Sequence, residues 1–406
     1  YIGGQFKVLP GAAFPQTKNE IDNFIPVARI SDLLLNPGKK FDFDGKTYEY
    51  PNTKIVYWAG GNPFHHHQDL NRLVKAWQKP NTIIVNEIWW NSQARHADII
   101  FPANTALERN DLMLNPRDPT LIANKKAMES FHNSKTDYEI FSGLAKELGF
   151  LEAFTENKDE LDWIKFIWDS SSKAHQRKDI SFPKFEDFWE KGFFELPKPE
   201  TEKVMLNDFR RDPNKFPLNT PSGKIEISSV TIANFELTDC FSHPYWFEPY
   251  EWLGNANKYP LHLISNQPKH RLHGQLDNAP NSLDSKINGK EPVMINSLDA
   301  SNRDIENGDI VMLYNARGKV LAGANISDNV MPGVVVLSTG AWFDPDYDLE
   351  LEKHGNPNVL TKDVGTSSLS QGPTCHTTLV ELRKANKKEI SEVGIFKSPE
   401  MLSKRS

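Results

Sequence analysis

Residues 54–77 read "KIVYWAGGNPFHHHQDLNRLVKAW", and this stretch decides the fold of the first part of the chain. Its opening, 54–59, is apolar and β-branched, which predicts a buried strand that ends at Gly60 and Gly61. The apolar residues that follow recur at i, i+3, i+4 and i+7, the single stripe of an amphipathic helix: Leu70, Leu73, Val74 and Trp77. The stretch therefore predicts a strand, a glycine turn and a helix.

The same alternation continues downstream. "TIIVNE" at 82–87 predicts a second buried strand, 91–97 a short helical segment, and "DIIFPA" at 98–103 a third strand. Strands that alternate with helices over about fifty residues indicate a parallel sheet with right-handed crossovers.

The middle of the chain has a less regular pattern. Residues 136–150, "TDYEIFSGLAKELGF", predict an amphipathic helix with an apolar side made of Tyr138, Phe141, Leu144 and Leu148. Residues 151–220 are rich in charged residues, Trp, Phe and Pro, which indicates helices and long loops. "TPSGKIEISS" at 220–229 predicts a turn that leads into a strand.

From residue 258 onward, short strands separated by Gly-Asp, Arg-Gly and Pro-Gly predict a β-barrel or sandwich. They include "YPLHLISNQ", "EPVMINSLDA" and "PGVVVLSTG", and "NARGK" at 315–319 is expected to join two strands as a hairpin. The expected fold class is thus α/β plus β, in three parts: 1–150, 151–250 and 251–406.

Composition limits the possible partners. The chain has 406 residues, of which 38% are hydrophobic and 25% charged, so a folded protein of two or three domains is expected. A net charge of −7 argues against nucleic acid as the main partner. Apolar runs such as 334–337 are far too short to span a membrane.

Cysteine usage and the first residue add two expectations. Cys240 and Cys375 are the only cysteines and form no CxxC, which argues against a zinc or iron–sulfur site built by this chain. Two buried free thiols are favoured over a disulfide. The chain opens on Tyr1 within loop-like sequence and without a signal peptide, so we expect a fragment or a processed product.

The glycine pair marks the first candidate site. Glycines after a buried strand let the backbone approach a ligand, and the helix that follows offers free N–H groups to a phosphate. Asn62 is expected to cap this turn or to bind the ligand, and His66 and Gln68 lie within reach of an anion. The alternative is an ordinary turn without a ligand.

Polar residues after the next two strands strengthen this hypothesis. Asn86 and Glu87 end the second strand, where an acidic side chain can accept hydrogen bonds from ribose, and Arg109 after the third strand can balance a phosphate. Open α/β sheets bind ligands at the carboxyl ends of their strands. A solvated glutamate is the alternative for Glu87.

Two other functions of this stretch are disfavoured. Consecutive helical residues point about 100° apart, so His65, His66 and His67 cannot converge on one metal ion, and no metal ligand is expected in this chain. We expect His65 and His67 to be packing or surface groups. A strict GxGxxG is absent, which argues against an ordinary NAD site.

A second candidate site lies in the β-rich part. "SNQPKHRLHGQLDN" at 265–278 follows a strand and is dense in hydrogen-bonding groups, and residues 355–382 form a long, polar segment with few charges. Such loops suit a backbone that wraps a flat, polar ligand, although a plain surface connection is the alternative.

These segments carry a family resemblance. "VYWAGGNPFHHHQDLNRL", "ARHADIIFPANTALERND", "ISNQPKHRLHGQLDN" and "NVLTKDVGTSSLSQGPTCHTTLVE" resemble the molybdopterin oxidoreductases of the dimethyl sulfoxide reductase family. The branch indicated is that of the trimethylamine N-oxide, dimethyl sulfoxide and biotin sulfoxide reductases, and "GGNPFHHHQD" favours the first two. The resemblance runs from about residue 26 to 385 and is weakest over 150–220.

The resemblance implies a molybdenum cofactor, Mo-bis(molybdopterin guanine dinucleotide), which carries the chemistry while the protein orients it. It implies a guanine dinucleotide site over 1–150, a mixed helical and loop region over 151–250, and a dinucleotide-binding barrel of double-psi type over 251–406. The implied cofactor-binding residues are Gly60, Gly61, Asn62, His66, Gln68, Asn86, Glu87, Arg109, Asp137, Ser265, His273, Asn358, Gln371 and Gly372. Asp137 is expected to contact guanine. The last five residues of this list, Ser265, His273, Asn358, Gln371 and Gly372, are expected to hold the pterin parts.

One departure from the family limits these expectations. In this branch a serine of the amino-terminal half ligates molybdenum, and no motif here matches it, so the chain resembles the carboxyl-terminal half and no catalytic residue is assigned. The expected partners are an S- or N-oxide, an electron donor such as a c-type cytochrome or a small redox protein, and the missing half. Two alternatives stay open: a formate or nitrate type of molybdopterin enzyme, and a non-catalytic dinucleotide-binding module. The resemblance favours the periplasm and anaerobic respiration, with the cytoplasm as the alternative.

Overall fold

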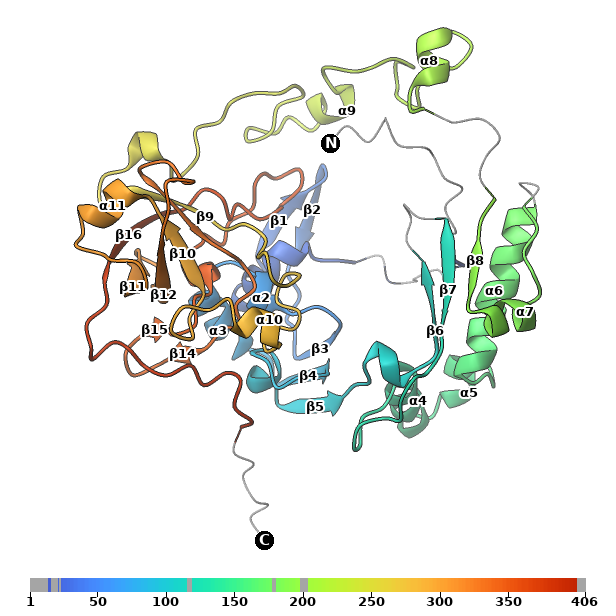
Figure 1. The fold of residues 1–406 in the computed structure, drawn as a ribbon. Helices are drawn as coiled ribbons and strands as arrows, with labels where there is room; N and C mark the ends of the chain where they lie inside the picture. The colour runs from blue at the N-terminus through green and yellow to red at the C-terminus, as the bar shows by residue number, and fades with distance from the viewer. Residues whose placement is uncertain are drawn as a thin grey trace. The chain divides into compact units, whose positions relative to one another are not determined.

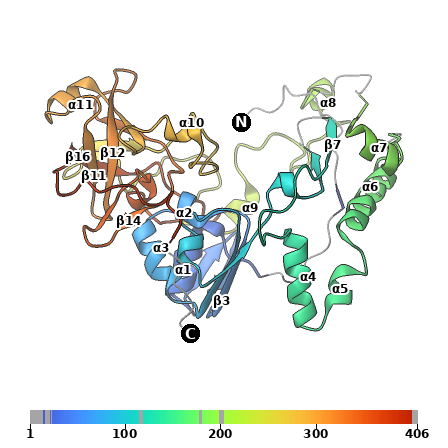
Figure 2. The same ribbon diagram turned by 60° about the horizontal axis from the view of Figure 1, so that its bottom comes forward.

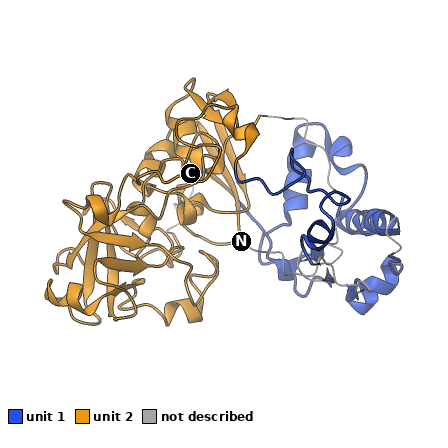
Figure 3. Ribbon diagram, turned by 90° about the horizontal axis from the view of Figure 1, so that it is seen from above, with its two compact units in different colours: residues 1–22, 101–227 blue, residues 23–100, 228–406 orange. Residues whose placement is uncertain are grey.

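The computed structural model describes residues 14–15, 21, 23–114, 119–176, 180–197 and 204–399. The chain divides into two compact units (Figure 3), one of residues 1–22 and 101–227 and one of residues 23–100 and 228–406. Each unit is described by itself. The division of the chain into three functional parts at 150 and 250 stays a prediction.

The larger unit contains the predicted parallel sheet. Its strands are β3 (Ile55–Ala59), β4 (Thr82–Glu87) and β5 (Ile99–Pro102), in that order, and β3 pairs with β4 in parallel. Between β3 and β4 lie α2 (Pro63–His66) and α3 (Leu70–Trp77), and the predicted 91–97 segment is one 3-10 turn, η3 (Ala94–His96). The strand–turn–helix prediction is confirmed.

Helix α3 shows why the sequence pattern worked. Its apolar stripe is buried, with Leu70, Leu73 and Ala76 fully inaccessible and Trp77 4% exposed. A short segment before the sheet adds η2 (Val27–Arg29), α1 (Ile30–Leu35) and a hairpin of β1 (Lys40–Phe43) and β2 (Lys46–Glu49). Helices α1 and α3 lie side by side next to β3 (Figure 2), where Leu34 joins the same core.

The carboxyl-terminal part of this unit is a closed barrel (Figure 1). Its six strands follow the order β10–β13–β9–β16–β11–β12, and β12 pairs back onto β10: β9 (Leu261–Ile264), β10 (Pro292–Ile295), β11 (Ile310–Tyr314), β12 (Lys319–Ile326), β13 (Val334–Leu337) and β16 (Leu379–Lys384). Two of the six pairs around the barrel are parallel, β10–β12 and β13–β9, and the other four are antiparallel. The predicted fold class, α/β plus a β-barrel, is confirmed.

Smaller elements surround the barrel. Strands β14 (Pro345–Asp346) and β15 (Leu351–Glu352) extend the sheet from β12, and the connections contain α10 (Pro280–Leu283), α11 (Ser297–Ser301), η5 (Leu253–Asn255) and η6 (Pro357–Val359). The hairpin predicted at 315–319 joins β11 to β12, with Tyr314 opposite Lys319. Barrel residues such as Leu263 and Val335 share one hydrophobic core with Leu70 and Leu73 of α3. The parallel sheet and the barrel are thus packed together in one unit.

The smaller unit combines an antiparallel sheet with helices. Its strands are β6 (Asp111–Leu114), β7 (Thr120–Asn124) and β8 (Phe193–Glu195), and its helices are η4 (Ala106–Glu108), α4 (Asp137–Glu147), α5 (Leu151–Thr155), α6 (Glu160–Gln176), α7 (Phe185–Lys191) and α8 (Asn207–Arg211). The core is aromatic, with the Trp168 and Phe188 rings stacked 3.7 Å apart between centroids. None of the helices that the structure describes combines the length and apolar character needed to cross a bilayer.

Three sequence expectations need correction. Helix α4 buries Ile140 and Ala145, whereas Leu148, assigned to its apolar side, lies beyond the helix end and is 71% exposed. The 220–229 turn forms, but within the described ranges no strand pairs with the residues after it, and α9 (Val230–Ala233) begins instead. Cys240 and Cys375 are free as expected, but they are half-buried.

Candidate functional site

The loop after β3 has the backbone geometry that a close ligand contact needs. Gly60 and Gly61 have φ of +81° and +74°, a region that residues with a Cβ rarely adopt, and no atom lies within 4 Å of the position a Gly60 Cβ would take. Asn62 caps α2 by accepting a hydrogen bond from Phe64 N at 3.0 Å. Its Nδ2 is buried and has no hydrogen-bond partner among the described residues, so it can donate to a bound molecule.

The three histidines that follow point into different surroundings. His65 is buried and its ring stacks on Trp342 at 5.8 Å between centroids; burial lowers its pKa to about 3. His67 is buried against Ser31 and Asp363, and His66 lies at the surface. Among the described residues no three His, Cys, Asp or Glu side chains are grouped as metal ligands.

His66 and Gln68 lie where the loop was predicted to bind an anion. Burial, followed by the charges of His67 and His273, lowers the pKa of His66. His273 from the barrel lies near this loop, because its neighbour Gly274 packs against the His65 ring. Gln68 is buried and its Nε2 donates to the His66 carbonyl at 3.0 Å. Gln68 therefore shapes the loop in this structure.

Asn86 and Glu87 end β4 directly beside the glycine turn, because Ala59 and Asn86 are paired across β3 and β4. Asn86 accepts a hydrogen bond from the Tyr57 hydroxyl at 2.9 Å. Burial raises the pKa of Glu87, and the carboxylate accepts from Ile88 N at 2.9 Å. The polar ends of two adjacent strands thus lie together, as predicted.

The barrel segment 354–363 contacts this loop directly. Asn358 is 3% exposed and its Nδ2 donates to the His65 carbonyl at 3.3 Å, while Asn356 Nδ2 donates to the Phe64 carbonyl at 3.1 Å. Asn356 was not identified from the sequence. Glu352 holds the backbone around Asn356 in place. Its buried carboxylate accepts four backbone N–H hydrogen bonds of 2.7–3.1 Å, from residues 344 and 354–356.

A second barrel segment, 271–277, also packs against the loop after β3, at His65. An alanine Cβ at Gly274 would lie 2.3 Å from His65 Nδ1, so only glycine allows this approach. Arg271 fixes the segment: its Nε donates to the His273 carbonyl at 3.1 Å and its Nη2 to the Thr339 carbonyl at 3.0 Å. Burial alone would raise the pKa of Asp277, but the charges of His354, Lys286 and Arg271 hold that pKa well below its usual value.

The remaining predicted residues are less closely connected. Ser265 follows β9 and is half-buried. Gln371 has φ of +52° and its Nε2 donates to the Asp42 carbonyl at 2.8 Å, and Gly372 O accepts from Thr366 N at 2.8 Å. The Gln371 bond ties the 365–372 loop to the β1–β2 hairpin. Within the described part of the chain, Ser265, Gln371 and Gly372 form no hydrogen bond with 60–68.

Arg109 and Asp137 belong to the smaller unit. Arg109 lines a polar cavity of about 300 Å³ together with Asn104, Glu108, Lys126 and Glu139, and it pairs with Asp111 at 3.2 Å. Asp137 is the first residue of α4, whose start is capped by Thr136 and Glu139. Their predicted roles at the cofactor stay predictions.

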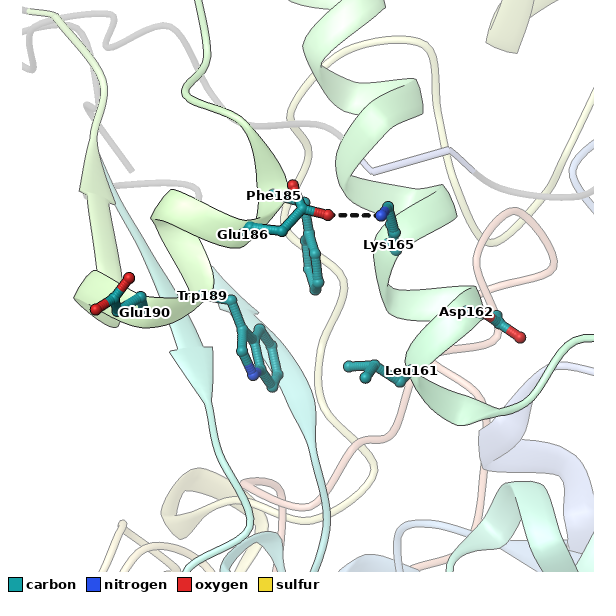
Figure 4. A pocket seen from close by; sticks show the side chains of 7 residues that line it. All are labelled: Leu161, Asp162, Lys165, Phe185, Glu186, Trp189 and Glu190. Carbon is teal, nitrogen blue, oxygen red and sulfur yellow. Dashed lines mark hydrogen bonds and ion pairs between the residues drawn. The ribbon is translucent and has the colours of Figure 1, made fainter.

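A second cavity in the smaller unit, of about 430 Å³, contains none of the predicted residues (Figure 4). Phe185, Trp189 and Leu161 form its apolar wall, and Lys165 pairs with Glu186 at 2.6 Å at its edge. Because Lys165 and Glu186 neutralise each other and the wall is apolar, the cavity does not indicate a particular ligand or reaction.

The site is thus a meeting of loops from the sheet and the barrel. Backbone at positive φ, buried amides and a free donor on Asn62 suit a long polar ligand with phosphates and a flat ring system. Sequence reasoning missed Arg271, Asn356 and Asp363, because only the folded barrel brings them to this place.

Family comparisons agree with this arrangement. Residues 261–379 match the family described as "Molydopterin dinucleotide binding domain", and residues 4–147 match "Molybdopterin oxidoreductase". The chain belongs to the molybdopterin oxidoreductases.

Among curated relatives, it is similar to S- and N-oxide reductases. It is 46% identical over 382 residues to biotin sulfoxide reductase of Cereibacter sphaeroides (94% of this chain, 51% of the relative). It is 44% identical to the dimethyl sulfoxide/trimethylamine N-oxide reductase of the same organism (97% and 48%) and to trimethylamine-N-oxide reductase of Haemophilus influenzae (93% and 47%). The chain therefore spans about half the length of these relatives. Acetylene hydratase from Pelobacter acetylenicus shares the fold, with a TM-score of 0.65 at 16% identity over 83% of this chain and 45% of that one.

Proposed function

We propose that the chain is part of a molybdenum enzyme that reduces an S-oxide or N-oxide by oxygen-atom transfer, with Mo-bis(molybdopterin guanine dinucleotide) as cofactor. The substrates considered are trimethylamine N-oxide, dimethyl sulfoxide, and biotin or methionine sulfoxide. The observation that carries the proposal is the bond from Asn358 to the His65 carbonyl, since it joins the two loops to which the resemblance assigns the cofactor, one in each of the two matched family regions. The three relatives named above are S- and N-oxide reductases, which does not favour the formate or nitrate alternative.

The chain's own residues would bind and orient the cofactor. Gly60 and Gly61 allow backbone to approach a pyrophosphate, Asn62 Nδ2 supplies a buried donor, and Glu87 at the neighbouring strand end can accept from a ribose. His273 and Asn358 would contact the pterin side. When bound, the cofactor supplies the two-electron chemistry. We also propose the contacts given above for the other predicted residues, Asp137 with guanine among them.

We further propose that turnover needs protein outside these 406 residues. The chain spans about half of the relatives' length, and the resemblance puts the molybdenum-ligating serine in the other half. An electron donor such as a c-type cytochrome or a small redox protein would complete the reaction. A periplasmic enzyme of anaerobic respiration is the location we favour, with the cytoplasm as the alternative.

Cofactor analysis and an activity assay test this proposal. The purified chain, expressed in a host that makes the cofactor, is analysed for molybdenum, for fluorescent pterin and for guanosine monophosphate released by acid. It is also assayed with reduced viologen dye and each S- or N-oxide, alone and joined to the other half of a relative. We expect turnover only for the joined protein. Oxidation of the dye by the chain alone would contradict the need for further sequence, and turnover with formate or nitrate instead would overturn the substrate class.

A further inference from the structure

Four charged side chains form a closed ring next to the candidate site. Each of two arginines pairs with each of two aspartates, at 2.5–3.0 Å: Arg29, Asp32, Arg72 and Asp363. We call this cluster the ion ring. Its two positive and two negative charges balance. Asp363 is its most deeply buried member, with a side chain only 1% exposed.

The two aspartates of the ion ring differ in where they lie. Asp32 is on α1, beside the helix α3 that carries Arg72, while Asp363 is on the barrel segment that follows η6. Asp363 Oδ2 also lies 3.3 Å from His67 Nε2, at the end of the triple-histidine motif. Of the two aspartates, Asp363 is therefore the one that links the barrel to the loop after β3.

The segments on both sides of this link are those of the candidate site. Asp69 N donates to the Thr361 carbonyl at 3.2 Å, and Asn358 reaches the His65 carbonyl a few residues earlier. These two contacts are single neutral hydrogen bonds, whereas Asp363 makes two charge-assisted pairs in a buried place. The ring therefore fastens the barrel segment to η2 and to helix α3, which begins directly after the loop.

We propose that Asp363 is a positioning residue: through His67 and the ion ring it holds segment 356–363 against loop 62–69 and the start of α3, in the arrangement that the cofactor requires. This inference rests on the proposed function. It assigns a task to His67 as well, as the member of the histidine motif that meets the barrel and leaves His66 free at the surface.

Asp32 provides a matched control, because it pairs with the same two arginines without touching the barrel. We compare Asp363→Asn and Asp32→Asn in the full chain, at a temperature where circular dichroism shows both folded, and follow amide hydrogen exchange. Asp363→Asn is expected to speed exchange at least tenfold at Asp69 and Leu360, whose N–H groups bond within the two segments. Asp32→Asn is expected to speed exchange at the end of α1, at Asn36, and to leave Asp69 and Leu360 unchanged.

Equal effects of the two substitutions at Asp69 and Leu360, or no effect of either, would overturn the inference. A purely structural role predicts equal effects, since both substitutions remove one charge from the same ring.

Guanosine diphosphate, a probe for the nucleotide end of the cofactor, separates this inference from the proposed function. It should slow exchange at residues 60–69 in the unaltered chain and in Asp32→Asn, and tenfold higher concentrations should be needed in Asp363→Asn. If the probe leaves the unaltered chain unchanged, the proposed nucleotide site is contradicted, while exchange without the probe still decides the role of Asp363.

Discussion

Asn358 Nδ2 donates a hydrogen bond to the carbonyl oxygen of His65 over 3.3 Å, between residues 293 positions apart in the chain. The bond links the barrel to the loop after β3, and both groups are buried. Its position inside the candidate site makes it a direct test of whether the two loops depend on each other.

Replacing Asn358 with alanine should loosen this junction. The buried His65 carbonyl would lose the Asn358 donor, and an unsatisfied buried polar group costs about 1–3 kcal/mol. Urea denaturation should show that loss of unfolding free energy. The control is Asn288→Gly, which removes an exposed bond to the Gly308 carbonyl at a φ of +51° that glycine adopts readily, and which should change the unfolding free energy by less than about 0.5 kcal/mol. A smaller effect at Asn358 than at Asn288 would count against an interdependent junction.

Gly274→Ala should destabilise the protein, whereas Gly143→Ala should stabilise it. The new Cβ would lie 2.3 Å from His65 Nδ1 and 3.1 Å from the Gly340 carbonyl, and such overpacking costs about 1–3 kcal/mol. Gly143 lies inside α4 with open space around its Cβ position, so Gly143→Ala should add about 0.5–1 kcal/mol. Thermal unfolding of both variants checks the opposite signs, and a neutral Gly274→Ala would show that the segments are not tightly packed.

Glu352→Gln should be costly although it changes few atoms. The carboxylate accepts four backbone N–H groups, and an amide NH₂ in place of one oxygen turns two of these contacts into donor-to-donor clashes. We expect a loss of about 2–4 kcal/mol in unfolding free energy. Glu129→Gln, which breaks an exposed pair with Lys126, should cost less than about 1 kcal/mol. Similar losses in the two variants would refute the special role of Glu352.

Lowering the pH should reduce the free energy of unfolding already above the pH range in which ordinary carboxylates titrate. Burial lowers the pKa of His65 and of His354 to about 3, so between pH 6.5 and 3 the unfolded chain binds two protons that the folded chain does not. Burial raises the pKa of Glu352 to about 7, so between pH 4.5 and 7 the folded chain binds one proton more there. For these three groups together, the net difference from pH 6.5 down to 4.5 is one proton, a loss of about 1.4 kcal/mol of stability per pH unit.

Unfolding free energies measured from pH 7.5 to 4.5 should show this decline, and His354→Asn should flatten it. A stability that stays constant or rises towards acid would contradict buried, neutral histidines.

Much of the fold follows from local patterns. The strands β3 and β4 and the helix α3 appear where apolar periodicity predicts them, because burial of one stripe or one run is a property of neighbouring residues. The glycine pair also identifies its own turn, since positive φ is demanded locally. Periodicity placed Leu148 on the buried side of α4, and the structure ends the helix before it.

The sequence alone determined the parallel unit, the barrel strands and the polar loops that follow them, because short-range periodicity and turn residues encode these features. Which of those loops meet depends on contacts that form only when the chain is folded. Arg29 and Asp363 are 334 positions apart, and Asn356 and Phe64 are 292 apart, so no local pattern reports their contact. Closure of the barrel through β12 and β10, together with the core shared with α3, brings these residues within hydrogen-bond distance. Buried charges and amides must then bond to one another, because burial keeps them away from water.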